Sequence, residues 1–134
     1  MHWYQKLPGR LLKEQEIVKS SFPQAKLVRV GDGNLAWVLY LRTNSDREYL
    51  IEIIYPDRFP SAYPLAFVLK PKIKMALHQY NDGHLCLFST TDRPERTYIP
   101  EKTTAVTIIV WTAAWLASYE IWQRTGTWPE RRRR

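Results

Sequence analysis

Residues 78–87 read HQYNDGHLCL and contain the only cysteine of the chain, Cys86. In this stretch a polar turn with Gly83 leads into a short apolar step that includes the thiol. Upstream, residues 55–64 read YPDRFPSAYP, a proline-punctuated link that follows a predicted strand. A catalytic nucleophile needs an exposed loop that a rigid scaffold holds in place. The two stretches together predict a catalytic cysteine on an irregular loop beside a small α/β sheet.

The residues before these stretches predict one helix and then a series of strands. Residues 9–20 have the helical spacing of an amphipathic helix. Its predicted inner face carries Leu11, Leu12, Gln15, Ile17 and Val18, with Arg10, Lys13, Glu14 and Lys19 around it. Strands are predicted over 26–30, 35–43, 48–55 and 65–69, with turn signals at 31–34 and 44–47. Trp37, Leu39 and Leu41 fall on one side of the second strand.

The residues after residue 71 predict a long loop followed by a long helix. Residues 72–102 have no long periodic pattern, and loops of this length are commonly functional. Residues 103–124 predict a helix that Gly126 caps and Pro129 prevents from continuing. We expect its inner face to consist of Val106, Ile109, Val110, Ala113, Leu116 and Ala117. We expect a second stripe to be core, with a partner-docking face as the alternative: Trp111, Trp115, Tyr119 and Trp122.

The composition is that of one small globular domain. The chain has 134 residues, of which 45% are apolar and 25% charged, and no apolar run reaches the ~20 residues of a membrane span. The first residues lack the apolar core of a signal peptide. A single cysteine excludes an internal disulfide and suits a reducing compartment. We therefore expect a cytoplasmic protein with one domain over 1–129 and a disordered tail over 130–134.

The net charge of +7 is concentrated at the C-terminus, where residues 131–134 are all arginine. Runs of basic residues are often solubilising or partner-docking arms, so nucleic acid is the less favoured ligand of this tail. The charge also permits an acidic protein partner.

The order of the elements resembles the ubiquitin-conjugating-enzyme (UBC) fold over residues 9–120. Residues 10–14, RLLKE, resemble the opening helix of that family. Residues 49–55 with the prolines that follow resemble its third strand and Pro-rich exit, and residues 83–87, GHLCL, resemble its Gly-x-Ile-Cys-Leu active site. The resemblance implies an α+β fold with an N-terminal helix, a four-stranded antiparallel meander, an active-site cysteine loop and a long C-terminal helix.

The departures from the eukaryotic pattern point to a narrower group. His78-Gln79-Tyr80 stands where that family has His-Pro-Asn, and the last helix is rich in tryptophan. These traits resemble the stand-alone bacterial members found beside cGAS-like cyclic-nucleotide synthases (CD-NTases) in anti-phage CBASS operons. The resemblance implies a thioester on Cys86 and transfer of a protein's C-terminus, expected to be that of the CD-NTase, to a target amine. Adenylation is expected from a separate activating enzyme, because no glycine-rich phosphate loop is present.

Cys86, His78 and Tyr80 are the first candidate catalytic residues. Cys86 is expected to act as a thiolate nucleophile, although free cysteines are also among the most buried residues in proteins. His78 is expected to brace the loop by donating to a backbone carbonyl, with a direct role as the alternative. Tyr80 replaces the asparagine linked to oxyanion support, so its hydroxyl is a candidate donor; packing beneath the loop is equally compatible with the sequence.

Asp82 and His84 complete the candidate set. Asn81 and Asp82 are residues that tight turns prefer, and Asp82 is also a candidate for orienting an attacking lysine. His84 is expected to support the site from the edge of the loop. Three histidines and one cysteine lack a zinc-ligand spacing, so we expect neither a metal nor a cofactor.

Two other functions are compatible with the sequence. The first is a UBC-like binding module that holds a synthase without chemistry, because Tyr80 departs from the family pattern and the acidic gate that often follows the cysteine has no clear counterpart. The second, weaker one is an RNA- or DNA-binding domain that uses the arginine tail. The neighbouring genes would separate the defence role from other bacterial conjugation pathways.

Overall fold

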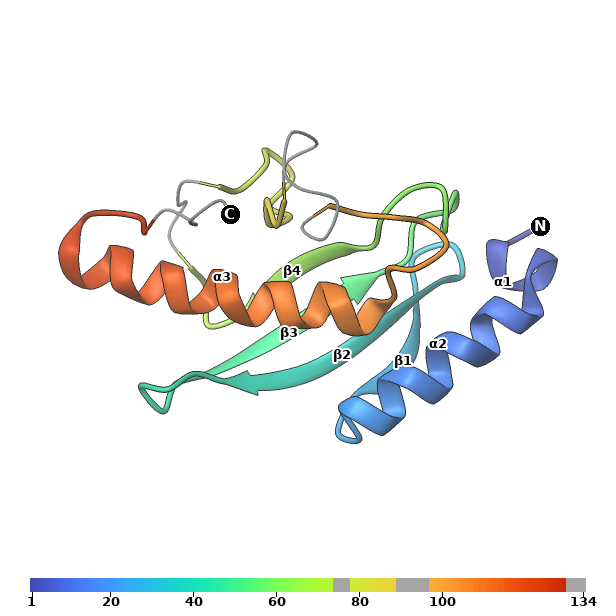
Figure 1. The fold of residues 1–134 in the computed structure, drawn as a ribbon, viewed down its shortest axis with the longest axis horizontal. Coiled ribbons are helices and arrows are strands. Elements are labelled where there is room, and N and C mark those ends of the chain that lie inside the picture. Colours follow the sequence, from blue (N-terminus) through green and yellow to red (C-terminus); the bar gives the residue numbers. More distant parts are fainter. Residues whose placement is uncertain (74–77, 89–96, 130–134) are drawn as a thin grey trace.

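The computed structural model describes residues 1–73, 78–88 and 97–129. Figure 1 shows a helical turn α1 (Trp3–Lys6), helix α2 (Pro8–Ser21), a four-stranded sheet and helix α3 (Ala105–Thr125). The strands are β1 (Lys26–Val30), β2 (Asn34–Arg42), β3 (Glu48–Ile54) and β4 (Leu65–Lys70). They form one antiparallel meander in the order β1-β2-β3-β4. The predicted α+β class and element order are therefore confirmed.

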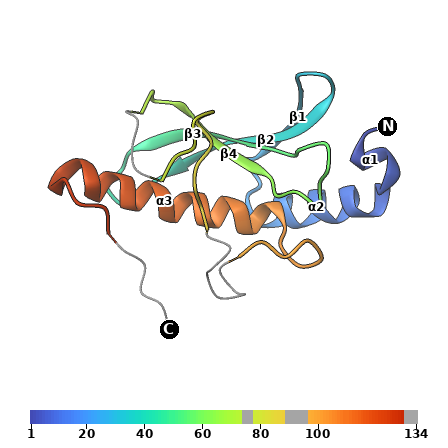
Figure 2. The same cartoon turned by 90° about the horizontal axis from the view of Figure 1, so that it is seen from above.

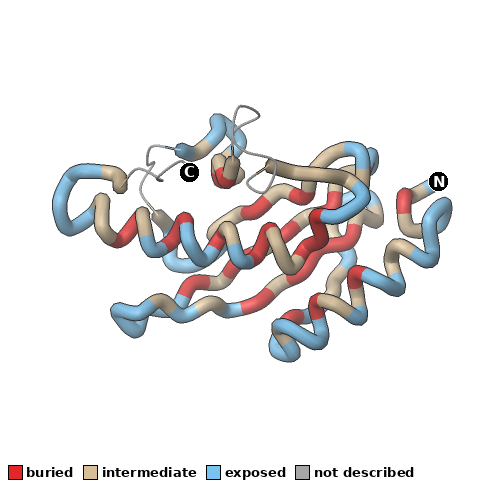
Figure 3. Tube along the Cα trace, in the orientation of Figure 1, coloured by how far each residue is buried: buried red, intermediate tan, exposed pale blue. Residues whose placement is uncertain are grey.

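The core lies between the sheet and the two long helices. Both α2 and α3 cover the same face of the sheet, as the two views in Figures 1 and 2 show. Strand residues alternate between the two faces, so Tyr49, Ile51 and Ile53 of β3 are buried against the helices. Trp37 and Leu39 of β2 join them, as predicted. Figure 3 shows the buried residues gathered on the strands and on the facing sides of the helices.

The predicted boundaries agree with the structure to within two residues, except for α1. Four residues are too few for a periodic pattern, so this turn was not predicted. Its Trp3 is buried, with ring centroids 4.9 Å from Tyr55 and 4.7 Å from Phe59. At the other end, Gly126 caps α3 as predicted, with φ 78° and its N–H donating to the Trp122 carbonyl over 2.7 Å.

The predicted inner face of α3 is only partly correct. Ile109 and Leu116 are fully buried, but Val110, Ala113 and Ala117 are exposed. Trp115 and Tyr119 of the aromatic stripe are buried, whereas Trp111 and Trp122 are partly buried and pack against the core, so the prediction of a core stripe is confirmed for half of its members. Helix α3 has apolar residues on all of its sides, so their periodicity does not single out one face. Contact with the sheet determines which face is buried. By length and composition α3 also qualifies as a membrane span, but 44% of that window is buried within the fold.

The predicted polar side of α2 is wrong at Glu14. The Glu14 side chain is fully buried, and its carboxylate accepts from the Tyr55 hydroxyl over 2.7 Å and from the Ala105 N–H over 2.9 Å. Arg10, one turn earlier, pairs with it over 3.1 Å. Leu12, predicted to face inward, is 58% exposed. A prediction from helical periodicity places every charged residue on the solvent side of the helix. A carboxylate with such hydrogen-bond and ion-pair partners can nevertheless be buried.

Candidate active site

The cysteine loop is a short turn closed by backbone hydrogen bonds. The Cys86 N–H donates to the His78 carbonyl over 2.8 Å, and the Tyr80 N–H donates to the His84 carbonyl over 2.9 Å. At the tip, the Gly83 N–H donates to the Tyr80 carbonyl over 2.9 Å. Gly83 has φ 97°, a conformation that residues with a Cβ rarely adopt. The polar residues of the turn therefore have the ordered geometry that the sequence predicted for them.

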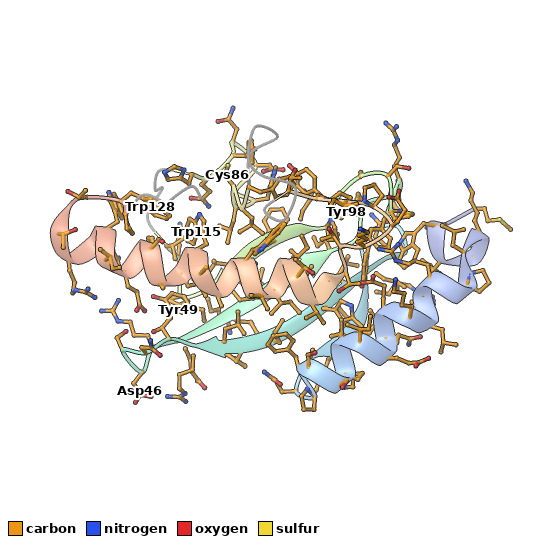
Figure 4. The ribbon with its side chains drawn as sticks, viewed as in Figure 1. Asp46, Tyr49, Cys86, Tyr98, Trp115 and Trp128 are labelled. Carbon is orange, nitrogen blue, oxygen red and sulfur yellow. The ribbon has the colours of Figure 1, made fainter. Side chains whose placement is uncertain are left out.

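The alternation of apolar residues fixes the loop onto the fold and leaves the thiol accessible. Leu85 and Leu87 are buried, and the Leu85 N–H donates to the Ala66 carbonyl of β4 over 2.9 Å. The residues between and after them, Cys86 and Phe88, are partly exposed. Figure 4 shows Cys86 above α3, with Trp115 and Trp128 on one side and Tyr98 on the other. Cys86 thus differs from a fully buried structural cysteine.

His78 supports the loop through its main chain and its ring. Its carbonyl accepts from Cys86 and also from Trp115 Nε1 of α3 over 3.0 Å. Its φ is 67°, in the left-handed region where histidine is among the tolerated residues. The imidazole packs on Trp128 with ring centroids 4.8 Å apart. The sequence suggested a side-chain donor to a carbonyl; in the structure the carbonyl of His78 is itself the acceptor.

Tyr80 places a hydroxyl beside the thiol. Cys86 Sγ and the Tyr80 hydroxyl oxygen lie 3.7 Å apart, within the reach of a sulfur hydrogen bond. The Tyr80 ring is stacked on His84 with centroids 4.2 Å apart and is 43% exposed, so it does not pack beneath the loop. The hydrogen bond with Cys86 raises the pKa of Tyr80 to about 12. Tyr80 therefore keeps its proton at neutral pH and remains a possible donor.

Asp82 and His84 form a second polar pair on the same loop. Asp82 Oδ1 accepts from the His84 N–H over 2.9 Å and lies 2.6 Å from His84 Nδ1. These two contacts, the backbone one first, lower the pKa of Asp82. The Asp82 side chain is 56% exposed, so its carboxylate faces solvent on the cysteine loop. Asp82 serves the turn, and the same geometry leaves it open to a cationic group.

One residue of the site was not predicted from the sequence. Tyr63, in the proline-rich link between β3 and β4, packs against aromatic rings of the cysteine loop. Its ring lies 4.9 Å from Phe88 and 6.3 Å from His84. The sequence marked this link as part of the fold, but no local pattern indicated that Tyr63 would reach the cysteine loop. Tertiary folding brings the two segments together.

The structure brings all five predicted candidates onto one loop, with Tyr80 in contact with the thiol. Within residues 1–73, 78–88 and 97–129, no group of three or more His, Cys, Asp or Glu side chains forms a metal site. The arginine tail and two parts of the predicted 72–102 loop, residues 74–77 and 89–96, lie outside the described residues.

Fold and loop together define a small α+β protein with an ordered, partly exposed cysteine after its last strand. The chain matches the family model of the Type II CBASS E2 proteins over residues 14–134, and it belongs to that family. This confirms the predicted resemblance to stand-alone conjugating-type proteins of CBASS. The family gives the chain an E2-like role in anti-phage defence and implies a protein partner within that system. A search of the curated proteins found no match.

Proposed function

We propose that this chain is a cytoplasmic transferase of the ubiquitin-conjugating type, with a UBC fold and Cys86 as its nucleophile. It accepts the C-terminus of a partner protein, the CD-NTase of its system, as a thioester and passes it to a target amine. The observation that carries the proposal is a partly exposed cysteine in an ordered loop, in a chain that belongs to the Type II CBASS E2 family.

The chemistry consists of two acyl transfers at one sulfur. In the first, the Cys86 thiolate attacks a C-terminal carboxyl that a separate enzyme has activated, and the activating group leaves. In the second, the amine attacks the thioester carbonyl, the C–S bond breaks and the thiolate is released. A proton is lost from the amine as the amide forms. Both steps pass through a tetrahedral oxyanion, which is the species that a positioned hydrogen-bond donor stabilises.

The loop residues have distinct roles in this scheme. Tyr80 donates its hydroxyl proton to the oxyanion, because this hydroxyl lies 3.7 Å from the sulfur and stays protonated at neutral pH. Asp82 attracts and orients the amine through its exposed carboxylate. His78 holds the backbone of Cys86, and His84 fixes both Asp82 and the Tyr80 ring.

The variant Cys86→Ala tests the proposal. Wild-type protein co-expressed with the CD-NTase and an activating enzyme is expected to form an adduct that a thiol reagent cleaves. Cys86→Ala should form none, while its melting temperature changes little because the thiol makes only weak contacts. Cys86→Ser is the matched control, since an oxyester on serine would resist the thiol reagent. An adduct that persists in Cys86→Ala would remove this cysteine from the mechanism.

A non-catalytic binding module is the second candidate, and the replacement of the family's asparagine by Tyr80 favours it. It predicts that wild type and Cys86→Ala retain the CD-NTase equally well and that neither forms a covalent adduct. Co-purification followed by intact mass measurement separates the two functions.

A further inference from the structure

Helix α3 has a second apolar face that the sheet does not cover. Four residues on it are exposed: Val110, Ala113, Ala114 and Ala117. Ile121, one turn after Ala117, is partly exposed. Steps of three and four residues place these side chains along one side of the helix, as in a helix that packs against a partner. Among the described residues, helix α2 lies beside only the first half of α3, so the second half of this face has no helix next to it (Figures 1 and 2).

The exposed side of α3 and the hairpin between β2 and β3 form a groove of about 490 Å³. Its apolar lining includes Leu41 of β2 and Ile121 of α3. A smaller pocket of about 310 Å³ shares Ser45 and Arg124 with the groove, and polar and charged residues line it. A ligand that fills both therefore needs an apolar surface and a polar group next to it.

The polar pocket carries positive charge. Glu120 is 7% exposed, and both of its carboxylate oxygens accept from hydroxyl groups of the hairpin. Arg47 donates to a neutral amide oxygen over 3.3 Å, and Arg124 is exposed and forms no hydrogen bond or ion pair with another described residue. Arg42, which lines the groove, is already paired with two acidic residues of the hairpin. Two guanidinium groups thus share the pocket with one carboxylate, and a carboxylate of a ligand would balance their charge.

We propose that this groove is a docking site for an amphipathic helix of a partner protein, with apolar residues on its inner side and an acidic residue over Arg124. An extended peptide binds chiefly by adding to a free strand edge, but β2 and β3 are each paired on both sides. A helix satisfies its own backbone and needs only side-chain contacts. The alanines of α3 permit its close approach, and a carboxylate is a group that a guanidinium binds in a bidentate manner.

The docking site lies on the side of α3 away from the cysteine. In Figure 4, Cys86 lies above α3, whereas Asp46 and Tyr49 of the hairpin lie below it. The inference rests on the proposed function for the name of the partner, which is the CD-NTase. It does not depend on the transfer chemistry, because a helix in this groove binds without a covalent bond to Cys86.

The affinity for the purified CD-NTase, measured by isothermal titration calorimetry, tests the proposal. Every chain in the assay carries Cys86→Ala, so only the non-covalent complex is measured. Ala117→Glu places a larger, charged side chain in the groove, and Arg124→Glu reverses the charge of the pocket. Each should weaken binding about 10-fold or more, and Arg124→Lys should lose less. Arg29→Glu is the matched control, because Arg29 is exposed on β1 and does not line the groove; it should leave the affinity unchanged.

Three outcomes would overturn the proposal. The first is a CD-NTase that does not bind, or whose affinity Arg29→Glu lowers as much as the two groove variants do. The second is a dimer of the chain alone, measured by sedimentation, that Ala117→Glu dissociates, since a second copy would then occupy the groove. The third is binding to anionic lipid vesicles that Ala117→Glu abolishes. Because Ala117 and Arg124 are exposed, thermal melts should show that all variants fold.

Adduct formation in chains that retain Cys86 separates this inference from the proposed function. If the wild type forms no adduct while the groove variants still weaken binding of the CD-NTase, the transfer function fails and the docking site stands. If the adduct forms and the groove variants bind the CD-NTase as the unaltered groove does, only the docking site fails.

Discussion

Among the described residues, two of the clusters that combine a carboxylate with a tyrosine differ in exposure. At the junction of α2, β3 and α3, Glu14 is fully buried and is paired with Arg10 and Tyr55. On the cysteine loop, Asp82 is more than half exposed, and Tyr80 is partly open to solvent. The same chemical groups thus form a buried network in one place and a solvent-exposed network in the other.

The difference shows how a small domain separates stability from chemistry. Burial, followed by the charge of Glu14, raises the pKa of Tyr55 well above its ordinary value, so this phenol is a fixed internal donor. The pKa of Tyr80 is raised chiefly by its hydrogen bond with Cys86, the residue whose reaction Tyr80 would assist. A buried carboxylate with several partners costs much to disturb, whereas an exposed one is available to an incoming ligand.

Glu14→Ala should have the largest effect on stability. It leaves the Arg10 guanidinium, which is largely buried, without its carboxylate, and it removes the acceptor of Tyr55 and Ala105. The expected loss is about 3–5 kcal/mol, measured by urea unfolding. Glu14→Gln keeps the acceptor oxygen and should lose less. Alkylation of Cys86 in the folded fraction should be unchanged; a slower reaction there would show that the two clusters are not independent.

Tyr80→Phe should have the opposite profile. Removal of one hydroxyl that faces the oxyanion should lower the rate of amide formation by about 10²- to 10³-fold. The melting temperature should change little, because the ring and its stacking on His84 are retained. Single-turnover transfer and thermal melts provide the two readouts. An unchanged rate of transfer would mean that Tyr80 only packs in the loop. The Tyr80 hydroxyl would then have a structural role, as the groups of the Glu14 cluster do.

His78→Ala should lower both the melting temperature and the rate of amide formation, since this residue joins the loop to the core. Alanine retains the carbonyl that accepts from Cys86 and Trp115 but removes the ring that packs on Trp128. It is also less tolerant of φ 67°, which costs roughly 1–2 kcal/mol. His78→Asn, which tolerates this conformation, should recover part of the stability. Equal stability of the two variants would exclude backbone conformation as the cause.

Glu120 is a third carboxylate with hydroxyl partners. Its replacement has the smallest expected effect on stability, and that effect changes gradually with pH. Burial alone would raise the pKa of Glu120, but hydrogen bonds from Ser45, Tyr49 and Thr43 bring it below its ordinary value. The folded state therefore binds its proton less readily than the unfolded state. The resulting stability is full above the unfolded pKa of ~4.3 and is lost as the pH falls through the folded value.

The comparison of wild type with Glu120→Gln isolates this term. The difference in their free energies of unfolding should be constant from pH 7 down to about 5 and shrink at lower pH. Urea unfolding across that range measures it. A difference that grows on acidification would mean that burial of Glu120 outweighs its three hydroxyl donors.

The sequence predicted the elements well because their signals are local. Turn residues at 31–34 and alternating strands fix the meander, and the glycine turn before Cys86 fixes the loop. The predictions failed where the environment of a side chain depends on a distant segment. Val110 was placed inward although it is exposed, and Glu14 outward although it is buried.

The sequence by itself therefore determined the order of the elements, the caps and turns, and the single thiol at the end of a polar turn. These follow from backbone conformations and periodicities that span a few residues. Only the tertiary structure decided which face of α3 meets the sheet, which carboxylate is paired inside the core, and that Tyr63 packs on Phe88 of the cysteine loop. Such contacts join residues far apart in the chain, and their free energy depends on burial and on partners that no local pattern specifies.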